Sequence, residues 1–117
     1  EKEMANAFLS ETDTGIGTSP ATILTCAAGT ETTVIGLSVS NIVTSQITVD
    51  VQLDASTRTS GAEDSVYIVK DAPVPVGGSL VVVGGDQKLV LEPGDTIKVT
   101  SGQASSADVV LSHLDIT

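Results

Sequence analysis

Aromatic residues are almost absent from this 117-residue chain, which has one Phe, one Tyr and no Trp. Hydrophobic residues nevertheless make up 40% of it. The core must therefore be built from Val, Ile and Leu. A single domain of this length buries roughly two-thirds of the surface of its unfolded chain. Carbohydrate sites usually need aromatic stacking faces, and Tyr67 alone makes a poor platform.

Cysteine and basic residues are also scarce. Cys26 is the only cysteine, which excludes an intrachain disulfide, and its setting ATILTCAA is typical of a buried strand. Five Lys and Arg against 15 Asp and Glu give a formal net charge of −10. Nucleic acids and anionic membranes attract clustered cations, so neither is expected as a partner. No apolar run approaches the roughly 18 to 20 residues that cross a bilayer.

Side chains that carry enzyme chemistry are equally sparse. A nucleophile–His–acid arrangement would have to use His113, which stands two residues before Asp115 in an expected strand. The glycines of GIGTSP and VGGSLVVVGG lack the lysine and the following helix of a phosphate-binding loop. We therefore expect a protein that is not an enzyme and has no cofactor.

The first 20 residues have the composition of an extended arm. The stretch MANAFLSETDTGIGTSP, residues 4–20, is rich in Gly, Ser and Thr, and its apolar anchors are Phe8, Leu9 and Ile16. Its glycines and its proline interrupt regular structure. We expect an arm over residues 1–20 and a β-sandwich domain over 21–117. Met4 is the expected native first residue, which would make residues 1–3 either non-native or an upstream extension.

After residue 20 the sequence changes to short β-rich runs, with turns roughly every 8 to 12 residues. The cleanest alternation places Ile47, Val49, Val51 and Leu53 inward. The pattern predicts an all-β fold with about eight short antiparallel strands in a sandwich, either jelly-roll or immunoglobulin-like. The expected strand runs are 21–28, 31–41, 45–54, 64–71, 79–85, 86–92, 93–101 and 106–117.

Two local features can be read within these runs. In the stretch 31–41, period-two spacing places Ile35, Leu37 and Val39 on one face. Between the apolar runs LVVV and LVL, Asp86 and Gln87 follow a glycine pair and predict a tight hairpin tip.

The last strand has apolar residues on both faces. Val110, Leu114 and Ile116 make the larger apolar set and are expected in the core, which turns Val109, Leu111 and His113 outward. One valine of Val81–Val83 is also expected outside. An outer strand with two apolar faces is an interaction site unless something covers it.

The cover could come from the chain's own N-terminal arm or from a neighbouring subunit, and the neighbour is favoured. An extended arm can also reach a neighbour through main-chain hydrogen bonds at a sheet edge. The residues expected at this interface are Phe8, Leu9, Ile16, Val109, Leu111 and His113.

Acidic residues bracket one loop of the expected sandwich and give a weak calcium candidate. Asp54, Glu63, Asp64 and Asp71 could converge at one end, and carboxylate oxygens suit Ca²⁺. Their spacing matches no calcium-loop pattern, and charged loops are usually just solvated. No metal site is therefore expected.

Several stretches resemble small virion structural proteins of tailed bacteriophages, a group familiar among phages of cyanobacteria and other aquatic bacteria. The resemblance covers most of residues 4–117 and includes the opening MANAF. Its most telling parts are IVKDAPVPVGGSLVVVGGDQKLVLEPGD and the ending, from TIKVTS to ADVVLSHLDIT. It is a resemblance of overall pattern and carries over no catalytic residues.

The resemblance implies a non-enzymatic β-sandwich built into a phage particle, made in the host cytoplasm and located in the virion. A capsid decoration or stabilising protein that docks in many copies is the leading expectation. Its partners would be copies of itself, with a trimer weakly favoured by particle symmetry, and a capsid or tail protein. Two alternatives stay open: a tail, neck or fibre component, and a carbohydrate-binding module.

Overall fold

The computed structural model describes residues 6–58 and 65–117. In that part of the chain no helix is present, and so none is long and apolar enough to cross a membrane. The expected first residue Met4 and the calcium candidates Glu63 and Asp64 lie outside the described residues. The strands are β1 (Asn6–Ile16), β2 (Ala21–Thr25), β3 (Glu31–Asn41), β4 (Ile47–Asp54), β5 (Ser65–Val74), β6 (Ser79–Val83), β7 (Leu89–Leu91), β8 (Thr96–Ser101) and β9 (Ala107–Ile116).

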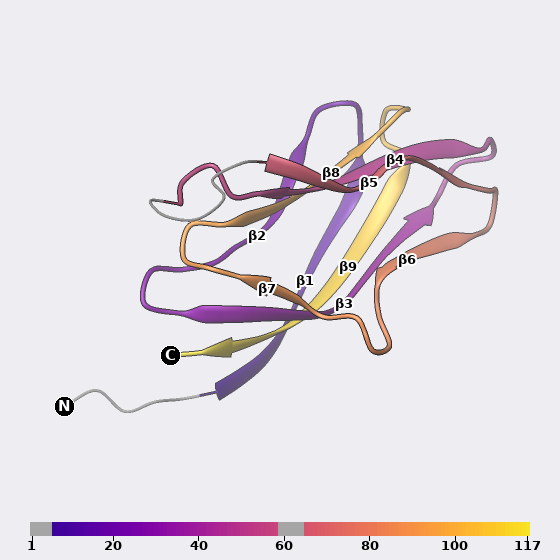
Figure 1. The fold of residues 1–117 in the computed structure, drawn as a ribbon. Coiled ribbons are helices and arrows are strands. Elements are labelled where there is room, and N and C mark those ends of the chain that lie inside the picture. Colours follow the sequence, from indigo (N-terminus) through magenta and orange to yellow (C-terminus); the bar gives the residue numbers. More distant parts are fainter. Residues whose placement is uncertain (1–5, 59–64) are drawn as a thin grey trace.

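The strands form two antiparallel sheets that enclose one core (Figure 1). One sheet has the order β1-β9-β3-β6, with β7 also paired to β3, and the other has the order β2-β8-β4-β5. The pairing is nested: β1 pairs with β9, β2 with β8, β3 with β6 and β7, and β4 with β5.

A chain doubled back on itself in this way and wrapped over two sheets is a jelly roll. The expected all-β sandwich is confirmed, and the strand order selects between its two forms. An immunoglobulin-like sandwich would place the first strand beside the second. Here the first strand lies beside the last, so Asn6 and Ile116 near the two ends of the described chain are direct partners.

Strand β4 follows the alternation expected from its sequence. Ile47, Val49 and Val51 are buried, and Thr48 between the first two is exposed. Leu53 is half-buried and packs against the edge of the core. β4 lies between β8 and β5 in its sheet. One face of an antiparallel strand in a sandwich covers the core and the other meets solvent, which gives this alternation.

Strand β3 departs from simple alternation. Val34, Leu37 and Val39 are buried, whereas Ile35 is only half-buried, so the expected shared face of Ile35, Leu37 and Val39 is wrong. The ladder between β3 and β9 shifts register between Val34 and Gly36. A bulge adds one residue to a strand and so reverses which positions point inward beyond it.

The apolar runs 79–83 and 89–91 do not form the expected hairpin. β6 pairs with Leu37–Ser40 and β7 pairs with Thr32–Val34, so the two strands lie end to end along β3. Residues 84–88 leave this line and return to it. Their turn is closed by the Gln87 N–H, which donates to the carbonyl of Gly84 at 3.2 Å, and it needs Gly85 because φ is +63° there.

The expected N-terminal arm is extended, but it is part of the sandwich. Residues 6–16 form β1, an edge strand that pairs antiparallel with β9 from Asn6 to Asp13 without interruption. The division at residue 20 therefore does not separate an arm from a folded domain. Composition misled here because β1 puts only Ile16 into the core and joins the sheet mainly through its backbone.

The core is aliphatic, as the composition requires. Cys26 lies buried in it and its thiol donates to the carbonyl of Thr30 at 3.3 Å, which fits the expected small apolar role. The largest fully buried apolar side chains come from both sheets: Val34, Leu37, Val39, Val49, Val51, Val74, Val83, Leu91, Ile97, Val99 and Leu111.

One carboxylate, Asp95, is fully buried between β7 and β8. It accepts hydrogen bonds from Arg58 Nε at 3.1 Å and from the Glu92 N–H at 3.0 Å. The hydrogen bond to Asp95 raises the pKa of Arg58. A buried charge is costly unless it is paired and hydrogen-bonded, so this ion pair has a structural role in joining the loop after β4 to the turn before β8.

The faces of β9 are the reverse of the sequence expectation. Leu111 is 1% exposed and Val109 and His113 are also buried, whereas Val110 is 46% exposed and Leu114 and Ile116 are half-buried. β9 is a central strand between β1 and β3, so its inner face is covered by the second sheet. The sequence prediction chose the face with more apolar residues as the core face. That choice was wrong because it treated His113 and Asp115 as surface residues.

A matched pair of truncations tests this assignment. Leu111→Ala removes a fully buried side chain and should lower the free energy of unfolding by about 2–5 kcal/mol. Leu114→Ala, three residues further along the same strand, should cost about 1 kcal/mol or less. Urea titration followed by circular dichroism measures both, and equal losses would contradict the assignment.

Candidate interaction surface

The six residues expected at an interface differ in their exposure to solvent. Phe8 is 74% exposed and Leu9 is about half exposed, so both are available for contact. The other four are buried within the chain and cannot form a surface: Ile16, Val109, Leu111 and His113. The apolar contact surface expected from β9 must therefore be sought on its opposite face.

That opposite face belongs to a broad surface on the outside of the five-stranded sheet. Residues directly opposite in neighbouring strands share a face, so the pairing register defines the surface row by row. We call the following rows the outer face: Phe8, Leu114, Thr33 and Val90; then Ser10, Ser112 and Gly36; then Thr12, Val110, Ser38 and Val81.

The outer face carries no charged side chain, although the whole chain has a net charge of −10. Its members are apolar residues, Ser, Thr and one Gly. Along the strands, charges return beyond its ends, at Glu31 opposite Ile116 and at Asp108 opposite Ser40. An uncharged surface on a strongly acidic protein removes the largest obstacle to close contact with another surface, which is the desolvation of charges.

The apolar members of the outer face are open to solvent. Val81 is 63% exposed, Val90 is 59% exposed, and Val110 and Phe8 are also exposed. The three rows measure about 13 Å along the strands and about 14 Å across four strands. Sequence reasoning missed Val110 and Leu114 as contact residues because it placed them in the core, and it left open which of Val81–Val83 points outward.

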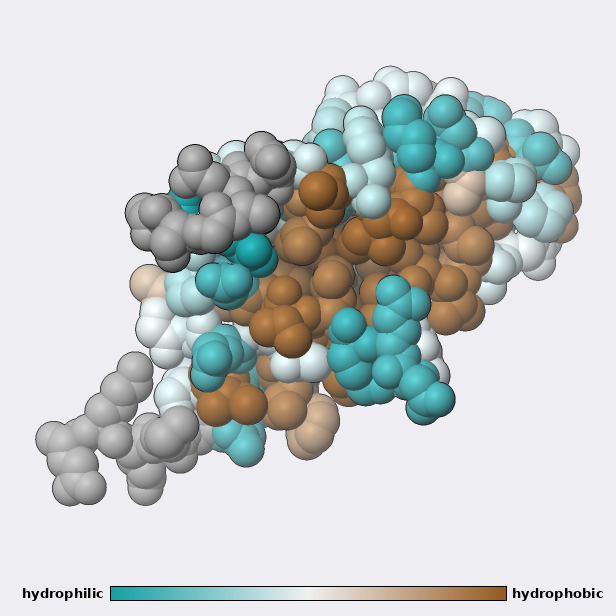
Figure 2. All heavy atoms as spheres, in the orientation of Figure 1, coloured by the Kyte–Doolittle hydropathy of each residue, from teal (hydrophilic) through white to brown (hydrophobic). Residues whose placement is uncertain are grey.

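Apolar side chains also gather at the side of the molecule where β5 approaches β6 (Figure 2). Here the edges of the two sheets are not covered by further chain among the described residues. Several side chains of β5 and β6 and of the neighbouring β4 and β7 are only partly buried against the core: Leu53, Ile68, Val69, Leu80, Val82 and Leu89. Because β6 and β7 form the edge, this apolar side adjoins the outer face at Val81 and Val90.

The one tyrosine offers little to a sugar ring. Tyr67 lies on β5 and is half exposed, but Lys70 Nζ lies 4.9 Å from the centre of its ring. The ammonium group covers part of the aromatic face through a cation–π contact. The Asp50 carboxylate lies 3.5 Å from the same ammonium and is the main cause of the raised pKa of Lys70.

His113 is buried between two carboxylates. Its Nε2 lies 2.9 Å from Glu11 Oε2 on β1, and its Nδ1 lies 2.8 Å from Asp115 Oδ1 on β9. Asp115 Oδ1 also accepts a hydrogen bond from the Thr32 hydroxyl at 2.8 Å. Both ring contacts are satisfied together when both nitrogens carry a proton. The cluster links the edge strand β1 to β9 and β3.

Loss of this link should loosen β1 selectively. His113→Leu leaves the Glu11 and Asp115 carboxylates without their donor, which should lower the free energy of unfolding by about 1–3 kcal/mol. Amide hydrogen exchange should speed up in β1 before it does in β4. Glu11→Gln keeps an oxygen acceptor for His113 and serves as the milder control. Unchanged protection of β1 in His113→Leu would show that the backbone ladder alone holds the strand.

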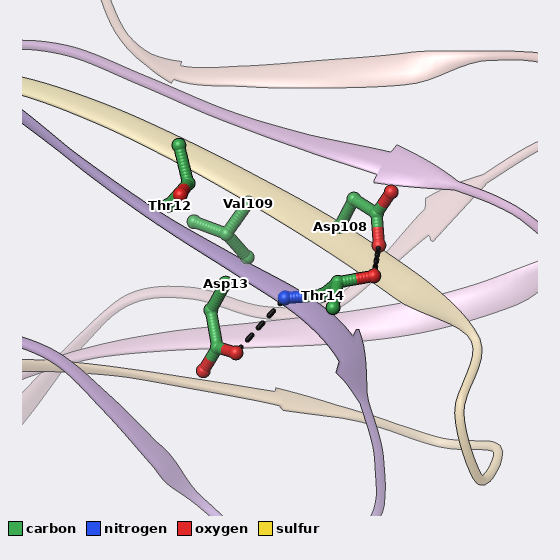
Figure 3. Close-up of a pocket in the computed structure, with 5 residues that line it drawn as sticks. All are labelled: Thr12, Asp13, Thr14, Asp108 and Val109. Carbon is green, nitrogen blue, oxygen red and sulfur yellow. Dashed lines mark hydrogen bonds between the residues drawn. The ribbon is translucent and has the colours of Figure 1, made fainter.

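A shallow hollow of about 370 Å³ lies where β1 leaves β9, and Figure 3 shows the residues around it. Asp108 Oδ1 accepts from the Thr14 hydroxyl at 2.6 Å and from the Gly15 N–H at 3.2 Å, and Asp13 accepts from the Thr14 N–H at 2.9 Å. Both carboxylates thus serve to fix the end of β1. The hollow coincides with the register shift between Asp13 and Ile16.

The calcium candidates do not come together within the described residues. Asp54 is opposite Ser65 at one end of β4, whereas the Asp71 N–H donates to Asp50 at 2.7 Å, four residues back along β4. Four residues of strand separate these positions by about 13 Å. No group of three or more His, Cys, Asp or Glu in residues 6–58 and 65–117 is arranged to hold a metal ion.

Asp54 is instead the centre of a hydrogen-bond cluster. It accepts from the Ser56 hydroxyl at 2.6 Å, from Lys98 Nζ at 2.9 Å, from the Ser56 N–H at 3.0 Å and from the Ser65 hydroxyl at 2.9 Å. These donors, the Ser56 hydroxyl first among them, hold the pKa of Asp54 well below its ordinary value. The cluster joins β4, β5 and β8 at one end of the second sheet.

This lowered pKa makes part of the stability dependent on pH. A carboxyl whose pKa is lower in the folded than in the unfolded state stabilises the fold above about pH 4, and this contribution is lost as the pH falls further. Asp54→Asn should therefore be less stable than the parent at pH 7, and the difference should shrink between about pH 4 and pH 2. Urea titrations at several pH values measure it, with Asp86→Asn as a control for the loss of one negative charge. A difference that stays constant with pH would contradict the assignment.

Comparison with known proteins shows a likeness in fold. No protein-family model and no curated protein matches this chain. A solved structure from work on Bacillus endospore appendages, described as a family of disulfide-linked pili, aligns with a TM-score of 0.51. It is 13% identical, and the alignment covers 99% of this chain and 88% of that one. At this identity the likeness concerns the fold, which runs over nearly the whole chain.

Proposed function

We propose that this chain is a non-enzymatic structural subunit of a phage virion, and most specifically a capsid decoration or stabilising protein present in many copies. The observation that carries the proposal is the uncharged outer face with its exposed Val81, Val90 and Val110. Acidic charge elsewhere keeps the free subunit soluble before assembly. The sequence resemblance to virion proteins supplies the setting: synthesis in the host cytoplasm and docking onto a capsid or tail protein.

The chemistry of the described residues supports a structural role over an enzymatic one. His113 is buried and held by Glu11 and Asp115, and the buried acid Asp95 is neutralised by Arg58. The histidine and the buried carboxylate Asp95 are thus both engaged in holding strands or loops together. Carbohydrate binding has less support, because Lys70 lies over the ring of Tyr67.

The cysteine content of this chain favours assembly by a non-covalent route. The aligned protein belongs to disulfide-linked pili. This chain has a single cysteine, Cys26, which is buried in the core and bonded to backbone carbonyls. Copies of this chain would therefore join through surfaces rather than through disulfides, which is the role we assign to the outer face.

A charge placed in the outer face tests the proposal. Val110→Asp introduces a carboxylate at an exposed position of a strand, so the free subunit should stay folded and lose only about 1 kcal/mol of stability. Its incorporation into particles should fall at least severalfold, because docking would bury an unpaired charge. Quantitative mass spectrometry of purified virions counts the copies, and electron microscopy of the particle locates them.

The matched control is Val76→Asp, which places the same charge at an exposed valine in the turn between β5 and β6. It should be incorporated like the parent. Wild-type incorporation of Val110→Asp would overturn the docking role of the outer face. A monomeric protein that binds arrayed glycans and is absent from particles would favour the carbohydrate-binding alternative.

A further inference from the structure

The four sheet edges of the sandwich differ in how they are protected against strand addition. Exposed edges are normally shortened, bulged, interrupted or marked with charge and proline. β2 has five residues and a register shift, and β6 and β7 are interrupted by residues 84–88. β5 has two register shifts, a proline at Pro73 and a positive φ of 53° at Asp71.

β1 is neither short nor interrupted over most of its length, and of these protections it carries only the charges of Glu11 and Asp13. From Asn6 to Asp13 it pairs with β9 in continuous register, without proline, glycine or bulge. Its side chains in this stretch are mostly exposed, and its outer edge has no partner strand within the described chain. Eight residues of regular backbone with a free hydrogen-bonding edge are enough for a full-length added strand.

The charges of β1 are compatible with one particular partner. Its carboxylates are Glu11 and Asp13, and the Glu11 charge already faces His113 at 2.9 Å. Two copies of β1 paired antiparallel about Ser10 would set Glu11 opposite Leu9, and Asp13 opposite Ala7, of the other copy. An axis at Glu11, Thr12 or Asp13 would instead place carboxylates opposite each other, which is destabilising. The sequence of the strand is thus compatible with self-pairing about Ser10.

The size of the outer face gives a reason for such pairing. An area of about 13 Å by 14 Å is far below the roughly 800 Å² that each partner buries in a stable complex. Joining two sheets edge to edge would place two outer faces side by side, with Phe8 of each copy opposite Thr12 of the other on that face. The outer face of one subunit is too small for a stable complex, but in the dimer the two outer faces would form one larger continuous surface.

We propose that β1 pairs antiparallel with β1 of a second copy of this chain, about a two-fold axis at Ser10, so that two five-stranded sheets become one. The proposal deepens the proposed function, since it says how copies of the subunit join. The contact is isologous and closes after two copies. Because both copies are acidic, association is expected to strengthen as salt screens their repulsion.

Single cysteines test the axis directly, in a Cys26→Ser background that removes the native thiol. Ser10→Cys lies on the proposed axis and should form a disulfide-linked dimer within minutes under mild oxidation, because it faces its own copy. Phe8→Cys and Thr12→Cys should crosslink poorly alone and readily when the two proteins are mixed. Ser79→Cys, exposed on the opposite edge of the same sheet, is the control.

A charge at the axis gives an independent measurement in the native-cysteine chain. Ser10→Asp would set two carboxylates opposite each other and should weaken dimerisation severalfold in sedimentation equilibrium, whereas Ser10→Asn should not. The proposal is overturned if Ser10→Cys crosslinks no faster than Ser79→Cys, or if the parent stays monomeric at high protein and salt concentration. If these tests fail while Val110→Asp still blocks incorporation, the edge pairing is wrong and the docking role of the outer face stands. If the crosslinking and dimerisation tests succeed while Val110→Asp is incorporated like the parent, the edge pairing stands and the docking role of the outer face is wrong.

Discussion

The ladder between β9 and β3 is the interaction on which the rest of this fold depends. β9 is the last strand in the sequence, yet it lies inside the five-stranded sheet, with β1 on one side and β3 on the other. Until the end of the chain is in place, β1 has no strand to pair with. Contacts between such distant parts of a chain are slow to form, so we expect this ladder to limit the rate of folding.

The positions of the strands were easier to predict from the sequence than which strands lie side by side in the sheets. The runs of β4, β8 and β9 stand out through alternation and turn residues, and the all-β sandwich follows from them. The relation of β6 to β7 could not be read in this way, because a turn at Gly85 and Asp86 suits a hairpin as well as an excursion from one edge. The shift at Gly36 was hidden for a related reason: a bulge is fixed by the partner strand and leaves little trace in local sequence.

The candidate surface was missed through the treatment of polar residues. A face that holds His113 and Asp115 looks solvent-exposed until Glu11 and Thr32, on two other strands, supply the missing hydrogen bonds. Buried polar groups in proteins are nearly always satisfied, but their partners are distant in sequence and cannot be inferred from one strand. The expected contact face of Val109 and Leu111 is therefore wrong, and the face of β9 that meets solvent carries Val110 and Leu114, which the sequence had placed in the core.

The excursion at residues 84–88 has a practical consequence. Its two ends are held by ladders to the same strand, β6 on one side and β7 on the other, while the turn itself is exposed. A longer segment inserted between Gly85 and Lys88 would start and finish on anchored backbone, so neither sheet would need to change register. Loop closure costs rise only slowly with length. The protein thus offers a natural place for displaying a foreign peptide, at the rim of the outer face.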